Sequence, residues 1–173
     1  MKAPHLWGLG LALFLATVPA AAIEHRLGLG MHVWRPLAQI RDEPLGGATN
    51  DLAALVSYQL VLYRPLKLQA DLEFFPNGFG GSGEEAWSPQ GLIVVGDRLY
   101  AAVGAGVFYS TNLAGNFSSA VYIARLGADL PVSPRLHLDL SADQRASDLD
   151  GLTRTDGKTV TFAVTVRVAL RRS

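Results

Sequence analysis

The sequence contains no cysteine, which excludes a disulfide framework, a thiolate metal site and a cysteine nucleophile. It also has no excess of charge of either sign, because 15 basic residues balance 15 acidic ones. This balance gives no electrostatic reason to expect nucleic acid or a strongly anionic surface as a partner. After residue 22 there is no uninterrupted apolar run of the roughly 18 residues typical of a spanning helix. Any membrane crossing by this part of the chain would therefore use strands.

The first 22 residues have the three zones of a secretory signal: a basic start at Lys2, an apolar stretch over residues 6–18 and the small-residue site Ala20-Ala21-Ala22. The apolar stretch is shorter than the roughly 20 residues that a spanning helix needs, which favours a cleaved signal over an uncleaved anchor. We therefore expect a signal peptide over residues 1–22, cleavage after Ala22, and a single domain over residues 23–173.

Apolar and polar residues alternate with a period of two through most of the mature sequence. The clearest segment is 66–75, where Leu66, Leu68 and Leu72 alternate with Lys67 and Asp71. A strand collects each of these sets on one side of a sheet, whereas a helix would scatter them. Eight segments of this kind are predicted to be strands: 25–34, 52–63, 66–75, 90–95, 99–110, 118–130, 135–143 and 160–171.

The segments that connect these predicted strands alternate strictly between two lengths. Tight turns with Gly, Pro or Asp lie at residues 63–65, 95–98 and 131–134. Longer stretches, rich in small and polar residues, lie between them at 35–51, 76–89, 111–117 and 144–158. Short turns at one rim and long loops at the other are typical of transmembrane barrels. The sequence therefore predicts an all-β fold, an eight-stranded antiparallel up-and-down transmembrane β-barrel.

A soluble up-and-down barrel has the same alternation but turns its apolar face inward, so the composition of the polar face has to distinguish the two. That face mixes balanced charges with Gly, Ser, Thr, Ala and Gln, as expected of a crowded lumen and not of a densely charged surface in water. The apolar face carries aromatic residues that we expect to contribute to a membrane girdle: Tyr58, Phe74, Tyr109, Tyr122 and Phe162. The predicted lumen charge network consists of Arg26, Lys67, Asp71, Glu73, Arg125, Asp129, Arg135, His137, Asp139 and Arg167.

In strand number and loop asymmetry, the mature chain resembles the small outer-membrane barrels of the OmpA and OmpX type. This resemblance implies location in the outer membrane of a Gram-negative bacterium, with the barrel-assembly machinery, outer-membrane lipid and lipopolysaccharide as partners. Chains of that class usually end in an aromatic residue. Here the last alternating segment ends at Leu170 and a basic tail, residues 171–173, follows it.

Some eight-stranded outer-membrane barrels are enzymes that act on lipid, so a catalytic constellation is conceivable in this chain. His137, Asp139 and Ser141 share one strand face, but alternate positions on a strand lie nearly 7 Å apart, too far for direct contact between Ser and His. The His-x-Ser-Asn arrangement associated with the lipid A deacylases is also absent. We predict no catalytic residue and interpret the three as lumen residues.

No metal or cofactor is predicted either. His25 and His32 fall near opposite ends of one predicted strand. Asp148, Asp150 and Asp156 lack the spacing and the closing Glu of an EF-hand. The glycine-rich stretch 78–83 has no strand-loop-helix context and is interpreted as a loop.

The sequence therefore favours a non-enzymatic outer-membrane barrel with a plugged polar lumen and a structural, adhesive or surface-interaction role. Two alternatives stay open: a lipid-modifying outer-membrane enzyme of the lipid A deacylase type, and a soluble periplasmic barrel with an apolar, ligand-binding interior. General porin activity is disfavoured, because the lumen of an eight-stranded barrel is only wide enough for side chains. No oligomeric state is predicted.

Overall fold

The computed structural model describes residues 23–34, 52–76, 85–111, 116–153 and 160–170. The predicted signal peptide, residues 1–22, lies outside the described residues, as does the basic tail at 171–173. Within the described part the chain is almost entirely strand. The strands are β1 (Glu24–Val33), β2 (Leu52–Tyr63), β3 (Leu66–Phe75), β4 (Ala86–Gly96), β5 (Leu99–Gly106), β6 (Tyr109–Ser110), β7 (Val121–Pro131), β8 (Leu136–Ala146) and β9 (Val160–Ala169).

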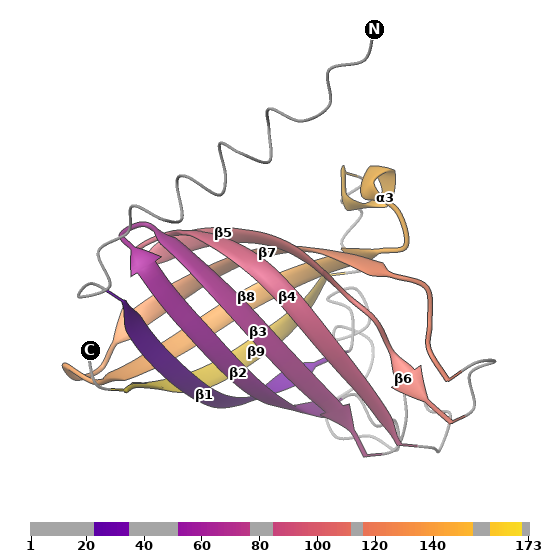
Figure 1. Ribbon diagram of the computed structural model, residues 1–173, viewed down its shortest axis with the longest axis horizontal. Helices are drawn as coiled ribbons and strands as arrows, with labels where there is room; N and C mark the ends of the chain where they lie inside the picture. The colour runs from indigo at the N-terminus through magenta and orange to yellow at the C-terminus, as the bar shows by residue number, and fades with distance from the viewer. Residues whose placement is uncertain (1–22, 35–51, 77–84, 112–115, 154–159, 171–173) are drawn as a thin grey trace, which may run out of the picture.

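Each long strand pairs antiparallel with the long strand that precedes or follows it, in the order β3-β2-β1-β9-β8-β7-β5-β4, and a further pairing of β3 with β4 closes the sheet. β1 and β9, the first and last strands, pair with each other over Arg26 to Val33. The short strand β6 pairs with β4 outside this ring. The prediction of a closed eight-stranded antiparallel up-and-down barrel is confirmed, and Figure 1 shows the strands inclined to the long axis of the barrel.

Four strand ends differ from the prediction by three residues or more, one of them being the start of β7 at Val121 instead of residue 118. β4 begins at Ala86 instead of residue 90, and β8 continues to Ala146 instead of 143. β5 stops at Gly106, and the pairing with β4 resumes only at Tyr109. The break lies opposite Pro89, which has no N–H for the ladder, although Pro89 O still accepts a hydrogen bond from Val107 N at 3.2 Å.

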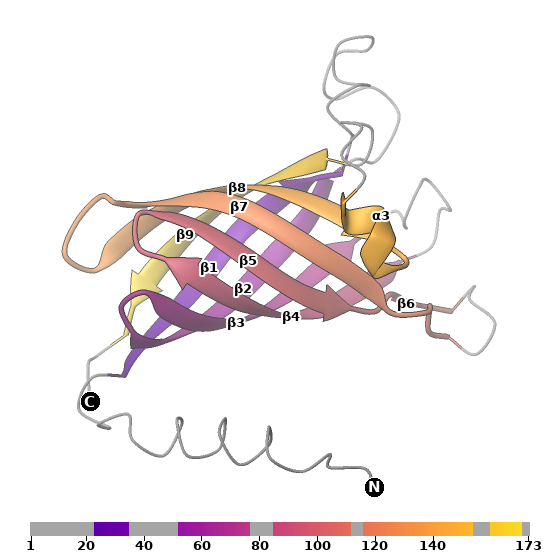
Figure 2. The same ribbon diagram turned by 90° about the horizontal axis from the view of Figure 1, so that it is seen from above.

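The short turns and both ends of the described chain lie at one end of the barrel, which we call the turn end (Figure 2). The longer connections lie at the other end, the loop end, together with the five-residue helix α3 (Leu149–Thr153). Gln144 Nε2 donates to Gly151 O at 3.2 Å and to Leu152 O at 3.0 Å, which holds α3 against the outer face of β8. None of the helices among the described residues is long and apolar enough to cross a membrane.

The side chains of the strands divide cleanly between the two faces of the sheet. Leu29, Val103 and Leu126 point outward and are 65%, 60% and 68% exposed. Arg125 and Arg167 point inward and are 2% and 0% exposed. The outer face of the strands is therefore apolar, and their charged side chains point inward.

Candidate functional site: the barrel interior

The charged side chains of the lumen form three groups along the barrel axis. The turn-end cluster, as we name it, comprises Glu24, Arg26, Lys67, Asp129 and His137. Asp129 is its centre: Oδ2 accepts from Arg26 Nη1 at 2.6 Å and from Lys67 Nζ at 3.3 Å, and Oδ1 lies 2.8 Å from His137 Nδ1. Arg26 also donates to Glu24 at 2.6 Å. These residues converge because each lies within a few positions of a tight turn or of the start of β1.

The central pair is formed by Asp139 on β8 and Arg167 on β9. Asp139 Oδ1 accepts from the hydroxyl of Tyr100 at 3.0 Å, and Oδ2 forms an ion pair with Arg167 Nη1. Arg167 and Asp139 are 0% and 1% exposed, so each charge depends on its neighbour for compensation.

The loop-end cluster contains Asp71, Glu73, Arg125, Asp143, Arg145, His32 and Thr161. Arg125 binds Asp143 through two parallel hydrogen bonds, at 2.6 and 2.8 Å, and donates to Asp71 at 2.8 Å. Arg145 binds both oxygens of Glu73, at 2.7 and 3.1 Å. Paired guanidinium and carboxylate groups of this geometry are the strongest hydrogen-bonded ion pairs in proteins.

Apolar side chains fill the rest of the lumen. On the inner faces of β4, β5 and β7 a buried cluster consists of Leu92, Val94, Tyr100, Ala102 and Ile123. A second apolar cluster lies at the loop end, where Trp34 and Phe108 pack against Ala53, Phe75 and Ala86. The guanidinium group of Arg145 lies 4.1 Å from the ring centre of Trp34 and joins this cluster to the charged one.

The structure places nine of the ten predicted network residues inside the barrel or at its turn end, distributed over the three groups. Arg135 is the exception, and its predicted place in the lumen is wrong. It precedes β8, is exposed, and belongs to the β7–β8 turn, where its backbone N–H donates to Ser133 Oγ at 3.4 Å. The alternation of β8 begins one residue later than expected, because the turn occupies residue 135.

Four further charged or titratable lumen residues were not in the predicted network: Glu24, His32, Asp143 and Arg145. The signal for two of them was available, because Asp143 and Arg145 continue the alternation of Asp139 and Ser141. The sequence pattern places Arg145 in the long connection 144–158, whereas β8 continues through it to Ala146. Its cationic charge is what neutralises Glu73.

Glu73, His32 and Thr161 form a chain of hydrogen bonds: His32 Nδ1 lies 2.6 Å from Glu73 Oε1, and His32 Nε2 lies 2.8 Å from Thr161 Oγ1. A carboxylate, an imidazole and a hydroxyl in this order are the components of a nucleophilic triad. Here, however, His32 and Glu73 are 0% exposed, and Arg145 occupies both oxygens of Glu73. The chain therefore links β1, β3 and β9 through buried side chains.

The ligand atoms of His32, Glu73 and Asp143 lie within 4.8 Å of one another, the spacing of a possible metal site. Both carboxylates already bind guanidinium groups, Glu73 that of Arg145 and Asp143 that of Arg125. A divalent cation would have to displace the two guanidinium groups or lie beside them. The three residues therefore fit a network whose carboxylates are neutralised by arginine better than they fit a metal site.

The candidate site residues of the sequence are not brought together in the described structure. His137 binds Asp129, whereas Asp139 binds Tyr100 and Arg167, so the two do not form a relay with Ser141. Asp148 Oδ1 accepts from Gly151 N at 2.6 Å, beside α3. Asp156 and the glycine-rich stretch 78–83 lie outside the described residues. His25 and His32 are separated along β1, and His25 Nδ1 lies 2.6 Å from the hydroxyl of Tyr58.

Comparison with models of known protein families finds none that matches this chain, and comparison with curated proteins finds no relative.

Proposed function

We propose that this protein is a non-enzymatic outer-membrane barrel, similar to the OmpA and OmpX type, with a plugged lumen and a structural, adhesive or surface-interaction role. Its partners would be outer-membrane lipid, lipopolysaccharide and the barrel-assembly machinery. One observation carries the proposal: the outward residues of the eight long strands include no Asp, Glu, Lys or Arg, whereas the inward residues hold the buried ion pairs.

Hydrocarbon explains this distribution better than water does. A barrel in water would gain nothing from leaving Leu29, Val103, Ile93 and Leu126 at 51% exposure or more, while placing its charges where each must be desolvated. In a bilayer the outward apolar side chains are already in a favourable solvent, and the closed ladder leaves no strand edge unpaired. The soluble alternative expects an apolar ligand-binding interior, whereas polar and charged side chains outnumber apolar ones among the buried residues described here.

Aromatic residues on the outer face support the same proposal. At the loop end, Phe74 and Trp87 stack with ring centres 4.3 Å apart, and Tyr109 and Phe117 lie 5.1 Å apart. At the turn end, Tyr63 is 39% exposed. Aromatic side chains at both ends of an apolar band are typical of the two interfaces of a membrane-spanning barrel.

The packed interior supports a role other than the diffusion of solutes through the lumen. Three charged groups and two apolar clusters occupy the lumen from the turn end to the loop end. Water or a solute would have to separate buried ion pairs in order to pass. This arrangement leaves the longer connections at the loop end as the parts available for specificity.

The membrane proposal is tested by single-cysteine labelling, because the chain has no cysteine of its own. Leu68 lies outward on β3, and Val132 lies in the β7–β8 turn and is 64% exposed. In outer-membrane vesicles opened by brief sonication, a water-soluble maleimide should label Val132→Cys but not Leu68→Cys, whereas a lipid-soluble maleimide should label both. Equal labelling of the two variants by the water-soluble reagent would contradict a lipid-facing wall. Heat-modifiable migration of each variant in detergent gels verifies that the barrel is closed.

A further inference from the structure

A pocket of about 330 Å³ lies on the outer face of the barrel at its loop end. Four residues line this rim pocket, as we name it: Glu85, Trp87, Tyr109 and Thr111. Trp87 on β4 and Tyr109 on β6 are directly paired, so their side chains leave the same face of the two strands. Glu85 and Thr111 each lie two positions from one of these rings, and a strand returns to the same face after two residues.

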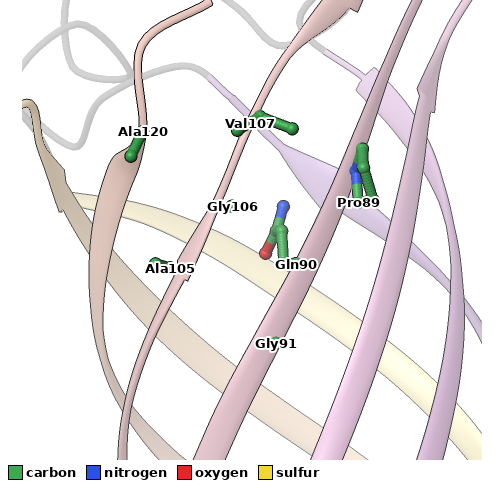
Figure 3. Close-up of a pocket in the computed structure, with 7 residues that line it drawn as sticks. All are labelled: Pro89, Gln90, Gly91, Ala105, Gly106, Val107 and Ala120. Carbon is green, nitrogen blue, oxygen red and sulfur yellow. The ribbon is translucent and has the colours of Figure 1, made fainter.

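β6, which provides half of the rim pocket, lies outside the closed ring of strands. Pairing between β4 and β5 ends at Gly106, and Val107 then lies across from Pro89, a residue without an N–H for the ladder (Figure 3). Pairing with β4 resumes at Tyr109, so β6 lies beyond β5 toward the loop end (Figure 2). The segment that carries Tyr109 therefore takes no part in closing the barrel.

Each ring of the rim pocket is held by a second ring beside it. Trp87 stacks with Phe74, with ring centres 4.3 Å apart, and Tyr109 packs against Phe117 at 5.1 Å. Trp87 nevertheless stays 39% exposed. The faces of aromatic rings carry partial negative charge and attract a cation that lies over them. Two neighbouring rings held in this way can therefore contribute to the binding of one cation.

The exposed charges of the loop end are of one sign. Among the described residues, they belong to Glu85, Asp148 and Asp150, all of them acidic. The Glu85 carboxylate has no ion pair within the described part of the chain. The guanidinium groups of Arg125 and Arg145 point into the lumen and bind carboxylates there. A membrane girdle accounts for the rings of the rim pocket, but not for a carboxylate without a counter-ion beside them.

We propose that the rim pocket binds an alkylammonium group, with the cation over the rings of Trp87 and Tyr109 and the Glu85 carboxylate as its counter-ion. Aromatic rings around a quaternary ammonium group are a recurring mode of recognition. A neutral sugar would stack on the same rings but would leave the charge of Glu85 uncompensated. The proposal goes beyond the proposed membrane function, because the rim pocket needs no bilayer to form. Two sources share this ligand chemistry, a soluble compound and a lipid head group.

The test follows the indole N–H signals of the folded mature barrel by NMR. The micelles are of a polyoxyethylene detergent, which has neither an ammonium group nor a sugar. After residue 22 the chain has two tryptophans, Trp34 and Trp87, and Trp34→Phe assigns their signals. The probes are choline chloride, its neutral isostere 3,3-dimethylbutan-1-ol and methyl glucoside, with sodium chloride as the control for ionic strength. Heat-modifiable migration verifies the fold of every sample.

We expect choline to move the Trp87 signal to saturation and to leave the Trp34 signal in place, because Trp34 packs against Phe75 and Phe108 at a separate site. The midpoint for the neutral isostere should be about five- to thirtyfold higher, the range expected for cation–π contacts with two rings.

Variants of the acidic residues test the counter-ion. Glu85→Gln should raise the midpoint for choline about two- to fivefold, because it removes the charge and keeps the shape of the side chain. The matched control Asp150→Asn removes another exposed loop-end carboxylate, outside the rim pocket, and should leave the midpoint unchanged.

Variants of Tyr109 test the ring. Tyr109→Phe keeps an aromatic face and its packing against Phe117, so choline should bind at the wild-type midpoint. Tyr109→Leu removes the face and should raise the midpoint about two- to fivefold. Tyr109→Phe also serves as the control for the fold of this segment.

Nanodiscs distinguish the two sources of the ligand. A lipid head group as ligand predicts that choline moves the Trp87 signal in phosphatidylglycerol discs but not in phosphatidylcholine discs, whose head groups already occupy the rim pocket. A soluble ligand predicts the same choline midpoint in both kinds of disc. Lack of movement in phosphatidylglycerol discs would contradict the proposal for either source.

Four results in micelles would overturn the proposal. These are a Trp87 signal that choline does not saturate, equal midpoints for choline and its neutral isostere, a lower midpoint for methyl glucoside than for choline, and unchanged choline binding in both Glu85→Gln and Tyr109→Leu. None of them affects the proposed membrane function, because the labelling contrast between Leu68→Cys and Val132→Cys tests that function separately.

Discussion

Arg125 on β7 and Asp143 on β8 lie at directly paired positions, and the guanidinium group donates to both carboxylate oxygens, at 2.6 and 2.8 Å. The third arm of the same group reaches across the lumen to Asp71 on β3, at 2.8 Å. One buried cation therefore joins three strands, the neighbours β7 and β8 and the more distant β3. Such groups do not make a barrel more stable than an apolar core would, but their loss leaves uncompensated charge.

Replacement of Arg125 by Met should therefore destabilise the barrel by about 3 to 5 kcal/mol, because Asp71 and Asp143 lose their shared counter-ion. The free energy of unfolding in urea, measured with the protein in phosphatidylcholine vesicles, checks this value. The matched control is Arg64→Met, which removes an exposed pair with Asp97 at 3.6 Å and should change stability by less than about 1 kcal/mol. Equal effects of the two substitutions would refute a stabilising role for Arg125 in the lumen.

Gly104 on β5 and Gly91 on the adjacent strand β4 should differ sharply in their tolerance of an added methyl group. A Cβ at Gly104 would lie 2.1 Å from Gly91 O, a backbone atom that cannot move without disturbing the β4–β5 ladder. Gly104→Ala should therefore lower the midpoint of urea unfolding, with a cost of about 1 to 3 kcal/mol. A Cβ at Gly91 would have no other atom within 4 Å. Gly91→Ala should therefore leave the midpoint of urea unfolding at the wild-type value, within experimental scatter. A neutral Gly104→Ala would show that the two strands do not approach as described.

Charge on the outer wall should be penalised according to depth. Val164 lies near the middle of β9, paired with Met31 and Leu140, whereas Leu99 begins β5 at the turn end and is 78% exposed. Val164→Arg should cost about 2 to 4 kcal/mol in a bilayer, and Leu99→Arg about 0 to 1 kcal/mol. Unfolding in vesicles measures both. If the two substitutions were equally tolerated, the wall would not be facing hydrocarbon.

The packed lumen should exclude solutes. Liposomes that contain the purified barrel should not admit glucose in a swelling assay, and planar bilayers should show no stable conductance step, because Asp139 and Arg167 occupy the middle of the lumen and Arg125 lies buried in the loop-end cluster. A sixteen-stranded porin reconstituted in parallel provides the positive control, since barrels of that size leave an aqueous channel. Glucose entry at the porin's rate would contradict a plugged interior.

The alternation along β3, β8 and β9 was strong enough to predict both the strands and the direction of their side chains. In β3 every second residue from Lys67 to Phe75 is buried, as the pattern of that segment indicates. Prediction was poorer for β4, whose facing was ambiguous because Leu92 and Val94 point inward while Ile93 and Val95 point outward. Both faces of β4 are apolar over these residues, so hydrophobicity does not alternate along the strand and cannot show which side chains point inward.

The partners of the charged residues could not be predicted in the same way. Arg125 and Asp71 are 54 residues apart, and His32 and Thr161 are 129 apart, so only closure of the sheet brings them together. Arg145 was missed because the end of a strand has no sharp signal in the sequence, and a shift of two residues decides whether a guanidinium lies in the lumen or in a loop. Arg135 was misplaced for the same reason at the other end of β8.

The sequence by itself therefore determined the class of fold, the number of strands and which face of most strands is polar, because these follow from local alternation and from the spacing of turns. Only the tertiary structure decided which charges pair, that Trp34, Phe75 and Phe108 pack together at the loop end, and that the outer wall is open at Gly91. The physical reason is that pairing and cavity shape depend on the register and curvature of the closed sheet. These properties arise between strands that are distant in sequence, so no local pattern records them.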